Sequence, residues 1–114
     1  MCRFNFMKLT IDRKIWLRGQ RESALLVKSG KMCCVGIYLN ACGVSSDDLY
    51  NILDPSYLEI PKKAKWLTCS SGSNSKSSID LMNINDKIGT KLKKRETEIK
   101  KIFKKHNIDV KFIH

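Results

Sequence analysis

Alternating apolar and polar positions predict a strand near each end of the chain. In Lys8–Asp12, Leu9 and Ile11 point to one side and the polar residues to the other, which is the pattern of a short half-buried strand. The segment 108–112 alternates in the same way and predicts a second strand. We expect these two strands to pair and so to tie the two ends of the chain together.

The longest uncharged stretch, Met32–Cys42, predicts a central helix. Cys34, Tyr38 and Cys42 recur every four residues, and apolar residues also lie between them. Such a helix is buried on most of its sides. Gly43 directly follows and fits the left-handed position that ends many helices.

Capping residues mark three further helices. Ser45 is placed to cap a helix over Ser46–Leu53, which ends before Pro55. The polar stretch Thr68–Ser78 reads as a flexible serine-rich loop.

Two more helices are expected in the C-terminal half. Either Ser77 or Ser78 is predicted to cap the first of them, and Thr90 is predicted to cap the last, over Lys91–His106. In that last helix the apolar residues form one narrow stripe and the cations occupy the other faces. Asn107 fits a left-handed residue after the helix.

These elements predict an α+β fold. We expect a small antiparallel sheet that includes the N- and C-terminal strands, packed against three or four helices. A chain of 114 residues forms one domain, here residues 7–114, and residues 1–6 read as an N-terminal extension before a second start at Met7. The residues expected inside are Trp16, Cys34, Tyr38, Leu39, Leu92, Ile99, Phe103, Val110 and Phe112.

The charge is strongly positive and unevenly distributed. The chain carries a net charge of +11. Residues 1–31 contribute +6 and residues 62–114 contribute +9, whereas residues 32–61 contribute −4. Two cationic ends therefore flank an acidic middle, which favours attraction to a nucleic acid or another polyanion. The alternative is a set of lysines that only solvate the surface.

Five cysteines bear on the compartment and on possible chemistry. Their number is odd, and the sequence shows neither a signal peptide nor an apolar run of membrane-spanning length. Reduced thiols in a cytoplasmic protein follow from this pattern.

Three interpretations are open for the cysteines near the central helix. Cys33 or Cys34 at a helix start could be a nucleophile, because the helix dipole favours a thiolate there. The pattern Cys-x-Gly, then a helix, then Gly-Val resembles the nucleophile helix of NlpC/P60 cysteine peptidases, which implies a hydrolase. A partner base is then required, and only His106 and His114 exist.

In the other two interpretations the cysteines have no catalytic role. A zinc site would have to gather its ligands from across the fold, because no Cys-x2–4-Cys pair occurs. Cysteine is also among the most buried residue types, so a role in core packing is the favoured interpretation and no metal or other cofactor is expected. The cysteines that a metal site would have to use are Cys33, Cys34, Cys42 and Cys69.

Two basic segments are candidate contact sites for a partner or a nucleic acid. In the first, Trp16 could stack a base while the surrounding cations hold phosphates, or it could be a core residue with a solvated rim. The second is the last helix, whose lysines could follow a phosphate backbone or simply face water. The candidate residues are Arg13, Lys14, Arg18, Arg21, Lys94, Lys101 and Lys105.

One further motif, "MNINDKIG", contains Asn85 and Asp86. These residues could cap a helix, form a turn or bind a cation. One acid and one amide make a poor Mg²⁺ site, so a turn is the expectation.

Several blocks together resemble a family of small uncharacterised proteins encoded by tailed bacteriophages and prophages. The blocks are "MKLTIDRKIWLRG", "SGKMCCVGIYLNACG", "LMNIND" and "IKKIFKKHNIDVKFI". The resemblance implies a phage accessory gene and no catalytic chemistry. Relatives look more acidic than this chain, which counts against nucleic-acid binding as a shared property.

These observations lead to a functional expectation. A small phage protein without a catalytic set is expected to act by stoichiometric binding to a host or defence-system component, like an anti-CRISPR or other anti-defence inhibitor, in the cytoplasm of the infected cell. The alternative is a nucleic-acid-binding protein that uses its basic ends. The remote alternative is the cysteine hydrolase.

Overall fold

The computed structural model describes residues 7–19, 25–27 and 29–114, and it confirms the α+β class. Strands β1 (Met7–Asp12) and β2 (Ile108–Ile113) pair with each other. The pairing is parallel, with Met7 opposite Ile108 and Asp12 opposite Ile113. The predicted pairing of the two strands is therefore confirmed, whereas the predicted antiparallel direction is wrong.

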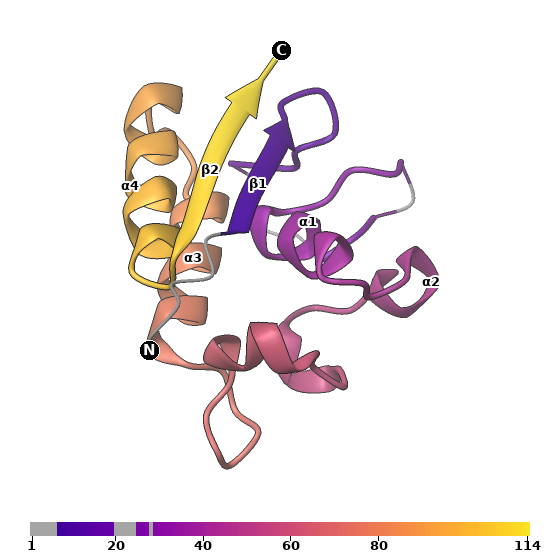
Figure 1. The fold of residues 1–114 in the computed structure, drawn as a ribbon. Helices are drawn as coiled ribbons and strands as arrows, with labels where there is room; N and C mark the ends of the chain where they lie inside the picture. The colour runs from indigo at the N-terminus through magenta and orange to yellow at the C-terminus, as the bar shows by residue number, and fades with distance from the viewer. Residues whose placement is uncertain (1–6, 20–24, 28) are drawn as a thin grey trace.

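The direction of β2 is set by the helix that precedes it. Helix α4 (Leu92–Lys104) runs back alongside the sheet, and Asn107 then reverses the chain with a left-handed φ of 62°. The last strand therefore points the same way as the first (Figure 1). Parallel strands need a long crossover connection, and here the helices between the strands supply it. Alternation identifies the buried face of a strand but carries no information about its direction.

The helices cover one face of the sheet. Leu9, Ile11 and Val110 are buried on the inner face, while Lys8 and Lys111 are exposed on the outer one. The predicted strand faces are thus confirmed.

The central helix α1 (Cys34–Ala41) is shorter than predicted but ends as expected. Gly43 has a φ of +106°, and the Val44 N–H donates to the Leu39 carbonyl at 3.0 Å, which forms a Schellman cap. At the other end Met32 lies outside the helix, because it pairs with Trp16 in an isolated bridge.

The acidic segment after α1 is mostly irregular. Ser45 caps α2 (Ser46–Leu49) by accepting from the Asp48 N–H at 3.2 Å, as predicted. The predicted continuation to Leu53 is wrong, because Asn51 adopts a left-handed φ of 59°. Two 3-10 segments follow, namely η1 (Pro55–Tyr57) and η2 (Lys62–Leu67).

Helix α3 (Lys76–Asp86) begins earlier than predicted. Its cap is Ser75, which accepts from the Ser78 N–H at 3.2 Å, and neither Ser77 nor Ser78 has that role. The serine-rich loop is therefore shorter than the predicted range 68–78 and ends at the cap.

The start of helix α4 also differs from the prediction. Lys91 occupies the cap position without a side-chain hydrogen bond, so the predicted cap at Thr90 is wrong. Leu92 is 39% exposed and Phe112 is half-buried, contrary to prediction. The other residues expected inside are buried.

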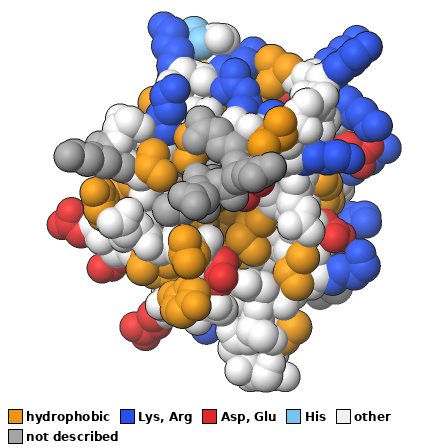
Figure 2. All heavy atoms as spheres, turned by 180° about the vertical axis from the view of Figure 1, so that it is seen from behind, with side chains coloured by type: hydrophobic (Ala, Val, Ile, Leu, Met, Phe, Trp, Pro, Cys, Tyr) orange, Lys and Arg blue, Asp and Glu red, His pale blue; other side chains and the backbone are white. Residues whose placement is uncertain are grey.

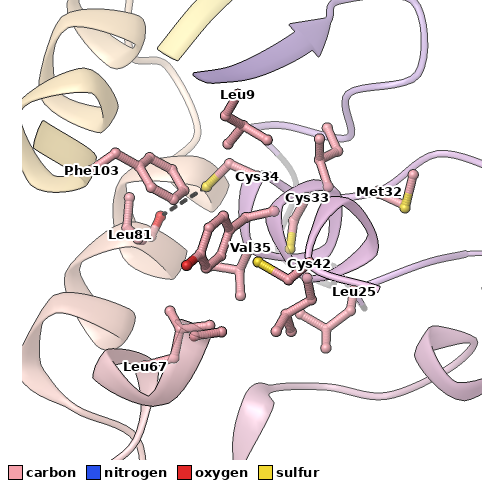
Figure 3. Packing of buried hydrophobic residues seen from close by; sticks show 14 of the residues in the cluster. Leu9, Leu25, Met32, Cys33, Cys34, Val35, Cys42, Leu67, Leu81 and Phe103 are labelled. Atoms are coloured by element: carbon pink, nitrogen blue, oxygen red, sulfur yellow. Dashed lines mark hydrogen bonds between the residues drawn. The ribbon is translucent and has the colours of Figure 1, made fainter. Parts of the chain in front are cut away.

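Helix α1 forms the centre of the core. Leu9, Leu81 and Phe103, from β1, α3 and α4, point toward it in Figure 3, and Leu67 from η2 approaches from below. Because α1 is surrounded in this way, its lack of charge follows from its position.

Candidate functional site

The Cys33 side chain is directed into the protein. It occupies the cap position of α1, where its Sγ accepts from the Gly36 N–H at 3.5 Å, and the residue is 2% exposed. Burial raises the pKa of the Cys33 thiol to about 11, outweighing the amide hydrogen bond that favours the thiolate. Cys33 does lie at the start of a helix, which made it a candidate nucleophile, but its thiol is protonated near neutral pH.

The other cysteines of this region fill the core. Burial raises the pKa of the Cys34 thiol well above its ordinary value, and it also raises that of Cys42. Both side chains lie among apolar neighbours in Figure 3. This arrangement supports the core-packing interpretation.

The histidines contact residues other than these cysteines. His106 Nε2 lies 3.0 Å from Ser77 Oγ, and its ring stacks on Trp66 with 4.0 Å between centroids. Burial and the neighbouring Lys105 lower the pKa of His106, so its imidazole is neutral at pH 7. His114 Nδ1 lies 3.2 Å from an Asp12 carboxylate oxygen. Neither histidine is therefore placed by these contacts as the base that a cysteine hydrolase requires.

The contact between Ser77 and His106 links the first turn of α3 to the end of α4. Trp66 Nε1 donates to Tyr38 Oη at 2.9 Å, and Tyr38 Oη donates to the Lys63 carbonyl at 3.1 Å. The stacked His106 ring thus joins the first turn of α3 to η2 and α1.

Thiol burial gives a direct prediction. Iodoacetamide at pH 8 is expected to modify the exposed Cys69 in the native protein at least about 100-fold faster than Cys33 or Cys34. Alkylation requires an accessible thiolate, and these two buried thiols offer neither access nor charge. Peptide mass spectrometry after timed quenching measures the rates, and labelling in urea is the control. Fast native labelling of Cys33 would restore it as a candidate nucleophile.

The described residues do not form an evident metal site. No three histidine, cysteine, aspartate or glutamate side chains converge within residues 7–19, 25–27 and 29–114. Cys69 lies in the loop before α3, whereas Cys33 and Cys34 lie at the start of α1 and Cys42 at its end.

Trp16 belongs to the core and does not offer a face to a base. It is 2% exposed, its Nε1 donates to Asn85 Oδ1 at 2.7 Å, and the Arg18 guanidinium lies 4.7 Å from its ring centroid. The prediction that Trp16 is a core residue is therefore confirmed.

Most of the described cations near Trp16 have structural partners. Arg13 binds Glu96 through two hydrogen bonds of 2.8 and 2.7 Å, and Arg18 donates to the carbonyls of Arg13 and Trp16. Lys14 is exposed. Arg21, the fourth predicted contact residue, lies outside the described residues.

The exposed lysines of α4 form two rows. The predicted residues Lys94, Lys101 and Lys105 share one row, which we call the α3-side row because Lys101 and Lys105 line the groove beside α3. The second, β2-side row consists of Lys93, Lys100 and Lys104, of which Lys100 and Lys104 line a hollow beside β2, and none of its members was among the predicted contact residues. Residues three, four and seven apart share a helix face, so this second row was readable from the sequence.

The structure joins the N-terminal cations to the β2-side row. Arg13 and Lys100 each lie 5.7 Å from the Phe112 ring centroid, and Arg13 also contacts α4 through Glu96. The α3-side row lies on the other flank of the helix, although Lys101 also reaches a hollow beside β2 and Lys104 also lines the groove beside α3. From behind, cations gather along the upper and right-hand margins, with acids at the left and also among the cations at the right (Figure 2).

Shallow grooves flank both rows. Between α3 and α4 lies a groove of about 570 Å³ with Ile84 and Ile102 among its lining and charges of both signs around them. Between α4 and β2 lie two adjoining hollows of about 250 and 380 Å³. The charged residues of the α3–α4 groove are Asp80, Glu98, Lys101, Lys104 and Lys105.

Asn85 has a different role from the expected turn. It is fully buried near the end of α3, where Oδ1 accepts from Trp16 Nε1 and from the Cys34 N–H, and Nδ2 donates to the Leu17 carbonyl at 2.9 Å. This side chain joins three parts of the chain and is occupied within the fold.

None of the helices in the described part of the chain has the length and apolar character that a membrane crossing requires. Comparison with protein-family models, curated proteins and solved structures finds no match to this chain.

Proposed function

We propose that this protein acts by stoichiometric binding to a host or defence-system protein, with the lysine rows of α4 as its contact surface. The observation that carries the proposal is the α4 surface itself, where six lysines are exposed beside two grooves. The resemblance to small phage proteins supplies the biological setting, the cytoplasm of an infected cell. An inhibitor of this kind needs a complementary surface and no catalytic group.

The composition of the α3–α4 groove favours a protein partner. Ile84 and Ile102 offer apolar contact, and Asp80 and Glu98 stand beside the lysines. Protein interfaces combine apolar contact with charges of both signs, whereas carboxylates in a phosphate-binding groove repel the ligand. A partner with acidic and apolar residues fits both features.

Binding to nucleic acid is the second candidate. The β2-side row lies close to Arg13, and the carboxylate on the same side of α4, Glu96, is paired with Arg13. Such a row can follow a phosphate backbone. Its affinity for duplex DNA would fall steeply with salt, because each phosphate contact releases a counterion.

The hydrolase alternative has the least support. Its candidate thiols are buried and protonated near neutral pH, and the described contacts of His106 are Ser77 and Trp66. We therefore propose a non-enzymatic function.

Reversing the charge of the α3-side row tests the proposal. The variant Lys94→Glu/Lys101→Glu/Lys105→Glu is expected to bind the partner at least tenfold more weakly than the original protein, because it presents like charge to an acidic surface. The measurement is capture from nuclease-treated bacterial lysate, followed by titration of the purified partner to obtain affinity and stoichiometry.

A matched variant separates this surface from net charge. Lys31→Glu/Lys62→Glu/Lys65→Glu changes three exposed lysines outside α4 and is expected to bind normally. Circular dichroism checks that both variants fold. Equal binding by the α4 variant contradicts the assigned surface, and loss of capture on nuclease treatment supports the nucleic-acid candidate instead.

A further inference from the structure

One edge of β2 has no strand beside it within the described residues. The sheet contains β1 and β2 alone. The carbonyls of Asn107 and Ile113 accept hydrogen bonds from β1, and backbone groups of alternate residues face opposite edges of a strand. The N–H and C=O groups of Ile108, Val110 and Phe112 therefore face the other edge. Unpaired groups of this kind are a template for another strand.

A hollow made of two adjoining parts follows this edge from Ile108 to Val110. The two hollows between α4 and β2 share Lys104, Ile108 and Asp109 in their lining. One extends to Lys8 at the start of the sheet, and the other extends along α4 to Thr97. The cations that line the hollow are Lys8, Lys100, Lys101 and Lys104, and the acid is Asp109.

We propose that an extended acidic segment of the partner protein docks in this hollow as a third strand beside β2. The inference rests on the proposed function, since it names the chemistry of the partner and its mode of binding. Main-chain hydrogen bonds to the free edge hold the segment, and the lysines pair with its carboxylates.

The spacing of the lysines suits a strand. Lys100 and Lys104 are four residues apart, which is about 6 Å along a helix at 1.5 Å per residue. Alternate residues of a strand lie about 6.6 Å apart. Acidic side chains two positions apart on the docked strand can therefore fall opposite Lys100 and Lys104.

An extended segment can also form hydrogen bonds with the backbone N–H and C=O groups of the β2 edge, which other ligands would leave unpaired. A nucleic-acid backbone has no N–H donors and would engage the lysines alone, and a helix satisfies its own main chain. Only a strand matches the lysines and the free backbone edge together. The nucleic-acid case is an outcome that the following experiment distinguishes.

The probe is the blocked heptapeptide Val-Glu-Val-Glu-Val-Glu-Val, added to the full chain at low salt. We expect amide hydrogen exchange at Ile108, Val110 and Phe112 to slow at least tenfold on saturation. Two further peptides carry N-methyl groups on alternate residues, one in each register. Only one edge of the added strand faces β2, so one N-methylated peptide should lose binding and the other should keep it.

Protein variants test the role of the lysines. Lys100→Glu/Lys104→Glu should weaken peptide binding at least tenfold, whereas Lys94→Glu/Lys105→Glu, on the α3-side row, should change it less than twofold. Unchanged exchange at the three amides overturns the inference, as does equal binding of both N-methylated peptides, which would indicate attraction by charge alone. Competition by duplex DNA without slowed exchange overturns it in favour of nucleic acid.

These outcomes are separable from failure of the proposed function. If the α3-side variant loses the captured partner while the β2 amides remain unprotected, stoichiometric binding stands and the strand mode is wrong. If no partner is captured but the peptide protects the three amides, the edge binds strands and the proposed function is wrong.

Discussion

Replacing Asn85 with alanine is expected to lower the free energy of unfolding by about 4 kcal/mol. The substitution leaves the Trp16 Nε1–H, the Cys34 N–H and the Leu17 carbonyl without their hydrogen-bond partner. Each buried polar group left unsatisfied costs about 1–3 kcal/mol, and a domain has only about 5–15 kcal/mol in total. Urea unfolding followed by tryptophan fluorescence measures the loss.

Asn83→Ala is the matched control for this change. It lies on the same helix and is exposed, so we expect its effect to stay within about 0.5 kcal/mol. A loss of less than about 1 kcal/mol for Asn85→Ala would mean that the network around this side chain is not structurally important.

Gly36→Ala is expected to lower the free energy of unfolding by at least about 3 kcal/mol. With Asn85→Ala, it is one of the two substitutions expected to be most damaging. Gly36 lies in the first turn of α1, and a Cβ there would overlap the Leu25 carbonyl oxygen and lie 2.8 Å from its carbonyl carbon. Leu25 is itself held by a hydrogen bond from its N–H to the Ile52 carbonyl at 2.8 Å. Backbone on both sides must move, which an overpacked core resists.

Gly43→Ala separates this steric effect from the loss of glycine itself. Gly43 has open space around its Cβ position but a φ of +106°, so alanine there suffers backbone strain of about 1–2 kcal/mol without a clash. Chemical denaturation of both variants should rank Gly36→Ala as clearly worse. The reverse order would indicate that α1 and the Leu25 segment are not packed as described.

Local patterns predicted the parts of the fold that depend on neighbouring residues. The uncharged run identified α1, and Gly43 with Ser45 identified its end and the next cap. These features succeed because a helix stop and a cap are determined within a few residues. The serine caps of α3 were misplaced because several serines adjoin one another, and the true one, Ser75, is chosen by the packing of the whole helix.

Features that depend on distant residues were not predictable in the same way. Asn85 looked like a turn residue, and nothing near it in sequence indicates that it bonds to Trp16, sixty-nine residues away. The parallel direction of β2 likewise depends on how α4 lies. For the candidate surface, composition indicated a lysine-rich helix, but which row borders Arg13 and the β2 edge follows only from the packing.

The pairing of β1 with β2 also constrains how the protein is made. Met7 pairs with Ile108, so 101 residues separate the partners. At about 5–20 residues per second, translation takes roughly 5–20 s to reach β2 after β1. During that time β1 emerges with an apolar inner face and no partner, and the sheet can form only after β2 has been synthesised. Nascent β1 therefore exposes an apolar face that a chaperone could bind before β2 is available.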